Sequence, residues 1–252
     1  MTLLSVHNLT VRRGECPVVD NASFSIAQGE CVGLIGPNGA GKTSLLRGAL
    51  GLLPHGGRST LSDLPARDRA AQAAWLPQTR EIAWPMSVER VVALGRLPYL
   101  ARGASLGTED EKAVNAAMSR MGLTNFRTRI ATQLSGGEQA RVLIARTLAQ
   151  ETPLLLADEP IAGLDPAAQI ATLEVFQTLA QEGRAVFTSL HDLSLAARYC
   201  TRLVVIHQGR IVADGPCDDV LTEDMLADVF RLRATIVPTP TGPLVQAMGV
   251  LT

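Results

Sequence analysis

The sequence predicts an α/β fold in one domain, with a helical subdomain inserted into a core of strands and helices. Four short apolar runs have the length of buried strands, and they cover residues 30–35, 154–157, 185–190 and 202–207. Between the first and second runs, at about residues 83–150, the chain is Ala-rich and its apolar residues have helical spacing. Polar residues follow the strand runs, so the functional groups are expected at the strand ends.

Each element follows from a local pattern. Residues 1–14 are typical of a strand, with Leu3, Val6, Leu9 and Val11 among polar residues. After the run at 30–35, a glycine-rich turn leads to a helix expected at 43–53. Further helices are expected at 88–94, 109–121 and 138–149.

Turn residues indicate two hairpins near the C-terminus. Gln208-Gly209 joins the run at 202–207 to a strand expected at 210–213, and the sequence TPTG indicates a terminal hairpin within 234–248. We therefore expect one domain over residues 1–235, with its helical subdomain at about 83–150. A short C-terminal extension, which is the expected hairpin, follows at 236–252.

Composition excludes several classes of protein. Hydrophobic residues make up 46% and charged residues 19%, which excludes a disordered chain. The net charge of −1 argues against binding to nucleic acid. No apolar run approaches the roughly 18 residues of a membrane helix, and the N-terminus does not resemble a signal peptide. The four cysteines form no C-x-x-C pair or zinc-site spacing, which favours a reduced, cytosolic protein.

The glycine-rich turn predicts a phosphate-binding loop. Residues 36–43 read GPNGAGKT and match the pattern G-x-x-x-x-G-K-[ST]. Glycine lets backbone N–H groups curl around phosphate oxygens, while Lys42 offers charge to the β- and γ-phosphates and Thr43 offers a hydroxyl to Mg²⁺. The expected strand before the loop and helix after it favour this function over a chance match. The candidate nucleotide-binding residues are Gly36, Pro37, Asn38, Gly39, Ala40, Gly41, Lys42, Thr43 and Ser44.

Two other segments carry candidate chemistry. Asp158 and Glu159 follow the apolar run at 154–157, where an acidic pair suits Mg²⁺ positioning and activation of water, although acidic strand ends are commonly solvated caps. Residues 134–138 read LSGGE before a helical run. Ser135, Gly136 and Gly137 could bind an anion through N–H groups at the helix N-terminus, or Ser135 could simply cap that helix.

Taken together, these motifs resemble the ATP-binding cassette (ABC) ATPase family. The resemblance rests on GPNGAGKT, LSGGE, LLLADEP, Gly163-Leu164-Asp165 and a histidine, His191, after a strand, in the family's order and spacing over essentially the whole chain. It implies a P-loop NTPase (RecA-like) core with antiparallel β and helical subdomains. It also implies that two copies pack head to tail, with each ATP between one copy's phosphate loop and the other's LSGGE.

The resemblance assigns a role to each remaining site residue. Glu159 resembles the catalytic base and His191 the histidine that contacts the γ-phosphate. Gln78, in LPQ, resembles the glutamine that touches Mg²⁺ and the attacking water, and Asp158 resembles the carboxylate associated with Mg²⁺. Ser135 and Gly137 would complete the partner's γ-phosphate site, with Gly136 beside them, and Asp165 would bridge the two copies. The implied cofactors are ATP and Mg²⁺, and the metal-associated residues are Thr43, Gln78 and Asp158.

The chain departs from the family's pattern at three places. An aromatic residue usually stacks on adenine before the phosphate loop, and that position holds Arg13, with Arg12 beside it. An arginine plane can stack on a base, but two exposed strand charges explain these residues equally well. Ala140 stands where glutamine is common, and Ile161 where threonine is frequent. No catalytic group is lost through these changes.

Softer signals concern the branch of the family. Residues 92–98, 191–200 and 221–230 resemble segments of ATPases that serve ferric-siderophore, haem and cobalamin importers. The segment 191–200 is also explained as an amphipathic helix that buries Leu193, Leu195 and Ala196. Rival classes are an ATPase for lipid or other export and a soluble ATPase of iron–sulfur cluster assembly. A DNA-repair ATPase is disfavoured, because the segment between Lys42 and Ser135 is too short for a long coiled coil.

The expected partners follow from the same resemblance. They are a second copy of the chain, transmembrane permease subunits and, indirectly, a substrate-binding protein, with no nucleic acid. The expected location is peripheral, on the cytoplasmic face of the inner (cell) membrane. An apolar cluster of Trp84, Pro85, Met86 and Val88 follows Gln78 and is expected to be either buried core or a groove for a permease helix.

Overall fold

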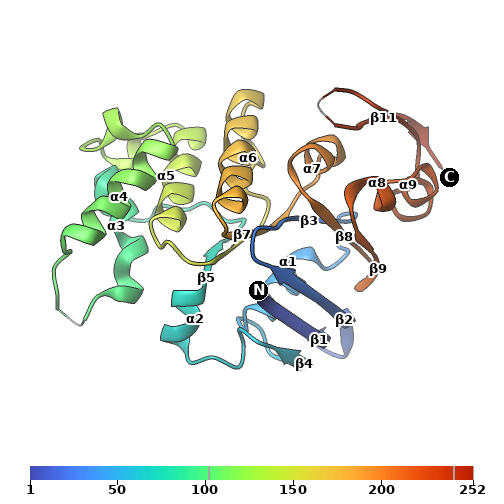
Figure 1. Cartoon of the computed structure of the whole chain (residues 1–252), viewed down its shortest axis with the longest axis horizontal. Helices are drawn as coiled ribbons and strands as arrows, with labels where there is room; N and C mark the ends of the chain where they lie inside the picture. The colour runs from blue at the N-terminus through green and yellow to red at the C-terminus, as the bar shows by residue number, and fades with distance from the viewer. Residues whose placement is uncertain (102, 241, 252) are drawn as a thin grey trace.

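The computed structural model describes residues 1–101, 103–240 and 242–251. A six-stranded sheet runs through the middle of the molecule, in the order β5-β6-β7-β3-β8-β9 (Figure 1). The first five of these strands are parallel and β9 pairs antiparallel at the edge. The strand bounds are β3 Cys31–Ile35, β5 Ala73–Leu76, β6 Leu154–Ala157, β7 Ala185–Ser189, β8 Arg202–His207 and β9 Arg210–Gly215.

The central strands are continuous apolar runs because both faces of the sheet are covered. Every residue of β3, β6 and β7 is buried. One face packs against α1 (Lys42–Ala49) and a separate antiparallel sheet, and the other against α6 (Pro166–Gln181) and α7 (Leu193–Tyr199). Phe187 of β7 lies in the first of these cores and Phe176 of α6 in the second. The predicted α/β class is confirmed.

The antiparallel sheet has three strands in the order β2-β1-β4. They are β1 (Thr2–Arg13), β2 (Cys16–Ala27) and β4 (His55–Ser59). The strand expected at residues 1–14 is therefore present as β1. It pairs with β2 through a tight turn in which Gly14 has a φ of 63°, a conformation that glycine adopts without strain.

Helix α1 is shorter than expected. It ends at Ala49 rather than near residue 53, because Gly51 has a φ of 66° and turns the chain away from the helix axis. The N–H groups of Gly51 and Leu52 then bond back to the carbonyls of Gly48 and Arg47. Such a glycine terminates a helix even where the apolar spacing continues.

The helical subdomain lies at one end of the long axis (Figure 1). The helices expected at 88–94, 109–121 and 138–149 correspond to α3, α4 and α5, with bounds that differ by one or two residues. Short helices, α2 and the 3-10 turns η1, η2 and η3, adjoin them. The bounds are α2 Ala66–Gln72, α3 Val88–Ala93, η1 Leu94–Tyr99, α4 Thr108–Arg120, η2 Thr124–Phe126, η3 Ala131–Gln133 and α5 Gly136–Leu148.

The C-terminal elements lie at the opposite end (Figure 1). They are α8 (Cys217–Val220), α9 (Glu223–Phe230), β10 (Leu232–Val237) and β11 (Leu244–Val250), and the last two form an antiparallel hairpin. A hairpin was expected here. The boundary placed at residue 236 falls inside β10, and Thr241 and Thr252 lie outside the described residues.

Three of the four cysteines are core residues. Cys31, Cys200 and Cys217 are buried and Cys16 is exposed, and all four are free thiols. Burial raises the pKa of Cys217 to about 11, and the neighbouring Cys31 thiol, together with burial, raises the pKa of Cys200. These thiols stay protonated at neutral pH, as small apolar core residues do.

Close contact between η1 and α5 gives a stability test of the helical subdomain. A Cβ built on Gly95 would lie 2.1 Å from the Arg146 carbonyl oxygen, a backbone atom that cannot turn aside. We expect Gly95→Ala to lower the free energy of unfolding by about 1–3 kcal/mol through overpacking. Gly56→Ala is the matched control, because the Cβ would meet no atom within 4 Å. Equal melting temperatures for the two variants would contradict this packing.

Candidate active site

The phosphate loop joins the carboxyl end of β3 to the start of α1. Two of its glycines are required by close contacts. A Cβ on Gly36 would lie 2.1 Å from the Ile206 carbonyl oxygen, and one on Gly41, whose φ is 109°, would lie 2.4 Å from the Val18 carbonyl oxygen. The loop therefore keeps a backbone-lined concave shape that a phosphate group can enter.

Lys42 begins α1 and points back over the loop. Its side chain is buried, and its Nζ donates to the carbonyl oxygens of Gly36, at 2.7 Å, and Pro37, at 3.1 Å. Burial lowers the pKa of the Lys42 ammonium, and the nearby carboxylates of Glu159 and Asp158 oppose that shift. A positive charge is thus held beside the helix N-terminus, where an anion is already favoured.

Asp158 follows β6 and is almost completely buried, at 1% exposed. Its Oδ1 accepts a hydrogen bond of 2.7 Å from the Ser189 hydroxyl at the end of β7, whereas its Oδ2 is buried without a partner among the described residues. An unpaired buried carboxylate oxygen is costly unless a cation or donor meets it. The chemistry of this carboxylate therefore fits Mg²⁺, and Thr43 lines the cavity beside the neighbouring Glu159.

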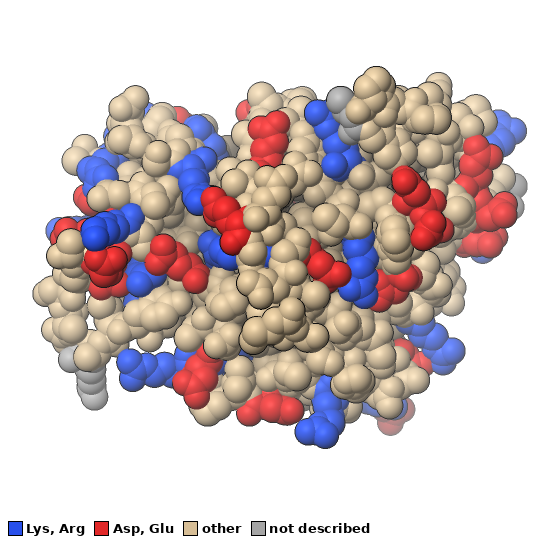
Figure 2. Space-filling view, in the orientation of Figure 1, with Lys and Arg blue, Asp and Glu red and all other residues tan. Residues whose placement is uncertain are grey.

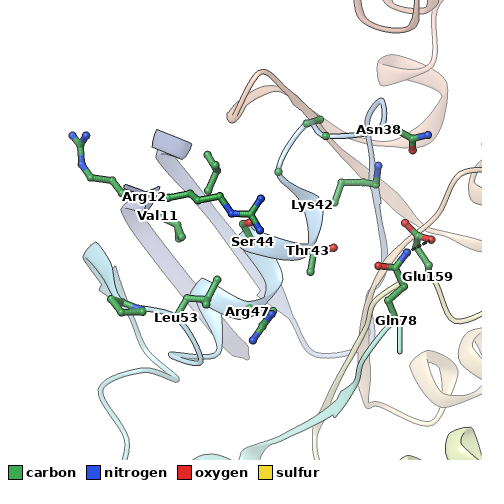
Figure 3. Close-up of a pocket in the computed structure, with 16 residues that line it drawn as sticks. Val11, Arg12, Asn38, Lys42, Thr43, Ser44, Arg47, Leu53, Gln78 and Glu159 are labelled. Carbon is green, nitrogen blue, oxygen red and sulfur yellow. Dashed lines mark hydrogen bonds between the residues drawn. The ribbon is translucent and has the colours of Figure 1, made fainter. Parts of the chain in front are cut away.

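The carboxylate of Glu159 lies between two of the other predicted residues. Its Oε2 accepts a hydrogen bond of 2.8 Å from Gln78 Nε2, and its Oε1 lies 2.6 Å from His191 Nε2. Figure 3 shows Gln78 and Glu159 pointing toward each other across from Lys42 and Thr43. The structure thus brings together Gln78, Glu159 and His191 from the ends of β5, β6 and β7.

Gln78 and Glu159 line a cavity of about 660 Å³, and this volume is large enough for a nucleotide. Thr43 and Ser44 line it together with the phosphate loop from Asn38 onward (Figure 3). Gln78 and Glu159 lie on the side that faces the loop. The cavity is also lined by Val18, whose carbonyl oxygen lies against the loop, and by Val11, Arg12, Arg13, Arg47, Leu53 and Pro54.

The end of the cavity away from Glu159 is where a nucleobase would lie. The described residues that line it include no aromatic side chain, whereas Arg12, Arg13 and Arg47 all reach it. Arg12 also donates to the Glu15 carbonyl oxygen at 2.8 Å, so one guanidinium is tied to the β1–β2 turn. A base at this end would meet guanidinium planes and the aliphatic Leu53.

The LSGGE segment does not line the cavity of the phosphate loop. Ser135 caps α5 in a capping box, because its Oγ accepts from the Glu138 N–H at 3.4 Å and its backbone N–H donates to Glu138 Oε2 at 2.8 Å. The Ser135 hydroxyl also donates to Glu138 Oε2, at 2.7 Å. These hydrogen bonds lower the pKa of Glu138. Ser135 and Gly137 line a second cavity of about 570 Å³ together with Asp165, and Gly136 is the first residue of α5. The structure does not bring this group to the chain's own phosphate loop.

Asp165 has a local role in the chain. Its Oδ1 accepts a hydrogen bond of 2.9 Å from the Ala168 N–H and so caps α6, with Pro166 at the first helical position. The two family departures nearby are explained by packing. Ala140 and Ile161 are both buried in the core, where the amide of a glutamine at 140 or the hydroxyl of a threonine at 161 would be removed from water.

Sequence reasoning missed two functional residues. Ser189 lies in the apolar run 185–190, and nothing in that run marks its hydroxyl as the group that bonds Asp158 and accepts from the Glu159 N–H. Arg80 donates to the carbonyl oxygens of Glu159, at 2.6 Å, and Ala162, at 2.7 Å. Its position, two residues after Gln78, was the one available signal.

The expected apolar cluster after Gln78 does not form one surface. Val88 is completely buried at the start of α3 and Met86 is partly buried against the core, whereas Trp84 is 70% exposed and Pro85 is exposed. Residues 86 and 88 pair with the segment around Ile130, so this short stretch faces inward. Of the two alternatives, the buried core is confirmed for Val88, while Trp84 and Pro85 lie at the surface.

The surface carries both signs of charge. On the face drawn in Figure 2, Lys and Arg side chains are interspersed with Asp and Glu. None of the helices in the described part of the chain is long and apolar enough to span a membrane.

Comparison with known proteins shows the family of the chain. Residues 19–162 match the family model described as ABC transporter. The chain is 41% identical to the hemin import ATP-binding protein HmuV of Streptomyces coelicolor, over 96% of this chain and 88% of that protein. It is 43% identical to the cobalamin import ATP-binding protein BtuD of Halobacterium salinarum, over 94% of this chain and 61% of that longer protein.

Solved structures share the fold. A metal-chelate type ABC transporter in an inward-facing conformation gives a TM-score of 0.85 at 24% identity, over 98% of this chain and 97% of that one. The ATP-binding cassette MJ0796, in a dimeric post-hydrolysis state bound to ADP and Pi, gives 0.73 at 26% identity, over 85% of this chain and 98% of that one. The chain belongs to the ABC transporter family and is one of its ATPase subunits.

Proposed function

We propose that two copies of this chain pack head to tail, bind two ATP molecules, and power import of an iron–siderophore, haem or cobalamin-type compound. The observation that carries the proposal is the position of the Glu159 carboxylate, which lies between Gln78 and His191 and lines the cavity of the phosphate loop. This arrangement suits attack of water on a bound γ-phosphate.

The phosphate loop would bind the triphosphate. Its N–H groups and the N-terminus of α1 attract the phosphate oxygens, and Lys42 Nζ can exchange its contacts with Gly36 and Pro37 for the β- and γ-phosphates. When bound, Mg²⁺ neutralises charge on the phosphates. Thr43 and the unpaired oxygen of Asp158 would hold it, with Gln78 beside them.

Glu159 would accept the proton of the attacking water. A hydrogen bond from Gln78 Nε2 fixes one carboxylate oxygen, and the contact with His191 Nε2 orients the other. The Glu159 side chain is mostly shielded, at 15% exposed, whereas the His191 side chain is 43% exposed. The exposed His191 would be accessible to the γ-phosphate of a bound nucleotide.

Replacement of Glu159 tests the base directly. We expect Glu159→Gln to bind ATP normally and to lower kcat by about 10²- to 10⁴-fold, because the amide cannot accept the proton. Glu109→Gln, at an exposed site in α4, is the matched control. ATPase rates and nucleotide affinity of the purified full-length chain are the measurements, and a normal turnover number would disprove the assignment.

Replacement of Lys42 separates binding from chemistry. Lys42→Ala should weaken nucleotide binding itself, because it removes the buried ammonium next to the loop. Lys112→Ala, on the exposed face of α4, provides the control. The measurement is equilibrium binding of a labelled ATP analogue, and unchanged affinity would contradict the role given to Lys42.

A head-to-tail dimer would give the second cavity its function. Ser135, Gly137 and Asp165 line that cavity, away from the chain's own phosphate loop. They can therefore complete the binding site of a nucleotide held by a partner copy. The similarity to the dimeric cassette MJ0796 supports this arrangement. The Ser135 hydroxyl, which donates to Glu138, would turn to the partner's γ-phosphate.

Mixing two inactive variants tests the shared site. Lys42→Ala damages a phosphate loop and Ser135→Arg damages the LSGGE segment, so each pure dimer has two defective sites. A mixed dimer has one doubly damaged site and one intact site, and we expect ATPase activity to recover partly on mixing. The shared site would be contradicted if the ATPase rate of the mixture were only the sum of the two pure variants' rates, at concentrations at which the wild type dimerises.

The proposed importer branch and the proposed partners are supported by similarity to known import ATPases. Similarity to a hemin and a cobalamin import ATPase supports a transmembrane permease as a direct partner and a substrate-binding protein as an indirect one. The same similarity supports a peripheral location of this chain on the cytoplasmic face of the cell membrane. Trp84 and Pro85 are candidates for the permease contact, because they are exposed and their neighbours are anchored to the subdomain. Rigid apolar side chains lose little freedom on binding.

Trp84→Glu tests that contact. We expect it to leave the basal ATPase of the isolated chain unchanged and to abolish stimulation by the permease and cargo uptake in membrane vesicles. Val212→Glu is the control, because Val212 is 50% exposed on β9, at the opposite edge of the sheet from β5. A Trp84 variant that is fully coupled to transport would exclude Trp84 from the interface.

A further inference from the structure

Arg80 binds the backbone on both sides of the turn that follows Glu159. One terminal nitrogen donates to the Glu159 carbonyl oxygen at 2.6 Å and the other to the Ala162 carbonyl oxygen at 2.7 Å. Charge-assisted hydrogen bonds of this kind are stronger than neutral ones, and the planar guanidinium fixes the direction of both donors.

The Glu159 backbone is the part of this turn that needs support. Its φ of 49° lies in the left-handed region, which residues other than glycine adopt at a cost. The Glu159 N–H donates to Ser189 Oγ, and its carbonyl oxygen accepts from both Arg80 and the Ala162 N–H. The N–H and the carbonyl oxygen of Glu159 are thus both hydrogen-bonded, and Arg80 provides the one charged donor among these contacts.

Arg80 is also partly removed from water. Burial lowers the pKa of the Arg80 guanidinium, and attraction to Glu159 opposes the shift. An arginine remains charged in such surroundings, so the positive charge beside the turn is permanent. The two hydrogen bonds to carbonyl oxygens replace part of the water that the half-buried guanidinium loses.

We infer that Arg80 is a positioning residue for the ATPase reaction, whose guanidinium holds the turn 159–162 so that the Glu159 carboxylate points at the attacking water. Gln78 binds the carboxylate and Arg80 binds the carbonyl, so one loop after β5 holds Glu159 at both ends. The segment beyond Ala162 leads to Asp165 in the second cavity. Arg80 therefore links Glu159 to the surface that faces the second copy. The inference rests on the proposed ATPase function.

Steady-state kinetics of the full-length chain test the inference. We expect Arg80→Met to lower kcat by about tenfold to 100-fold, the effect of misplacing a catalytic group by an ångström or less, with KM for ATP unchanged. Arg80→Lys retains charge and one donor, so its kcat should lie between those of Arg80→Met and wild type. Arg58→Met, at an exposed arginine of β4, should retain wild-type kcat.

A double-variant comparison separates positioning from general stability. If Arg80 acts through Glu159, Arg80→Met should not lower the residual single-turnover rate of Glu159→Gln any further. A merely structural arginine would give additive losses and a lower melting temperature. If Arg80→Met does not fold, the same comparison is made with Arg80→Lys.

The possible outcomes are distinct. Wild-type kcat in Arg80→Met or in Arg80→Lys overturns the inference, as do additive losses in the double variant. Absence of ATPase in the wild type, or full activity in Glu159→Gln, contradicts the proposed function instead. A fall in kcat at constant KM that is not additive with Glu159→Gln supports the inference.

Discussion

The site depends on parallel pairing of β5, β6 and β7. Because the carboxyl ends of parallel strands meet at one edge of a sheet, Gln78, Glu159 and His191 converge although they are separated by 81 and 32 positions along the chain. Continuous burial of β6 and β7 fixes their register, since their apolar side chains pack on one core or the other. The packing that stabilises the fold also sets the positions of the candidate catalytic groups.

Burial of two charged groups at the carboxyl ends of the parallel strands carries an electrostatic cost. Asp158 is buried with one oxygen that lacks a partner among the described residues, and Lys42 is buried against carbonyl oxygens. A cation next to Asp158 and a phosphate next to Lys42 would relieve both costs together. Nucleotide and metal binding should therefore stabilise the domain through the groups that serve the chemistry.

The sequence predicted four strands of the central sheet, β3, β6, β7 and β8, and the helices α1, α3, α4 and α5, because their patterns are local. It did not indicate β2 or the longest helix, α6. It did not indicate β4, whose residues His55–Ser59 include two glycines and become a strand only by pairing with β1. It also did not indicate β5, because Ala73–Leu76 contains no β-branched residue. The glycine loop and acidic pair were recognisable as motifs, whereas Ser189 and Arg80 act through backbone and carboxylate groups that only the tertiary fold brings near them.

The central claim is that one copy's phosphate loop and another's LSGGE segment form the site of ATP hydrolysis. Light scattering of the Glu159→Gln variant in Mg²⁺-ATP, combined with a count of bound nucleotide, tests it most directly. We predict that the mass doubles on addition of ATP and that each chain retains one ATP. A chain that stays monomeric while its phosphate loop is saturated with ATP would contradict the claim.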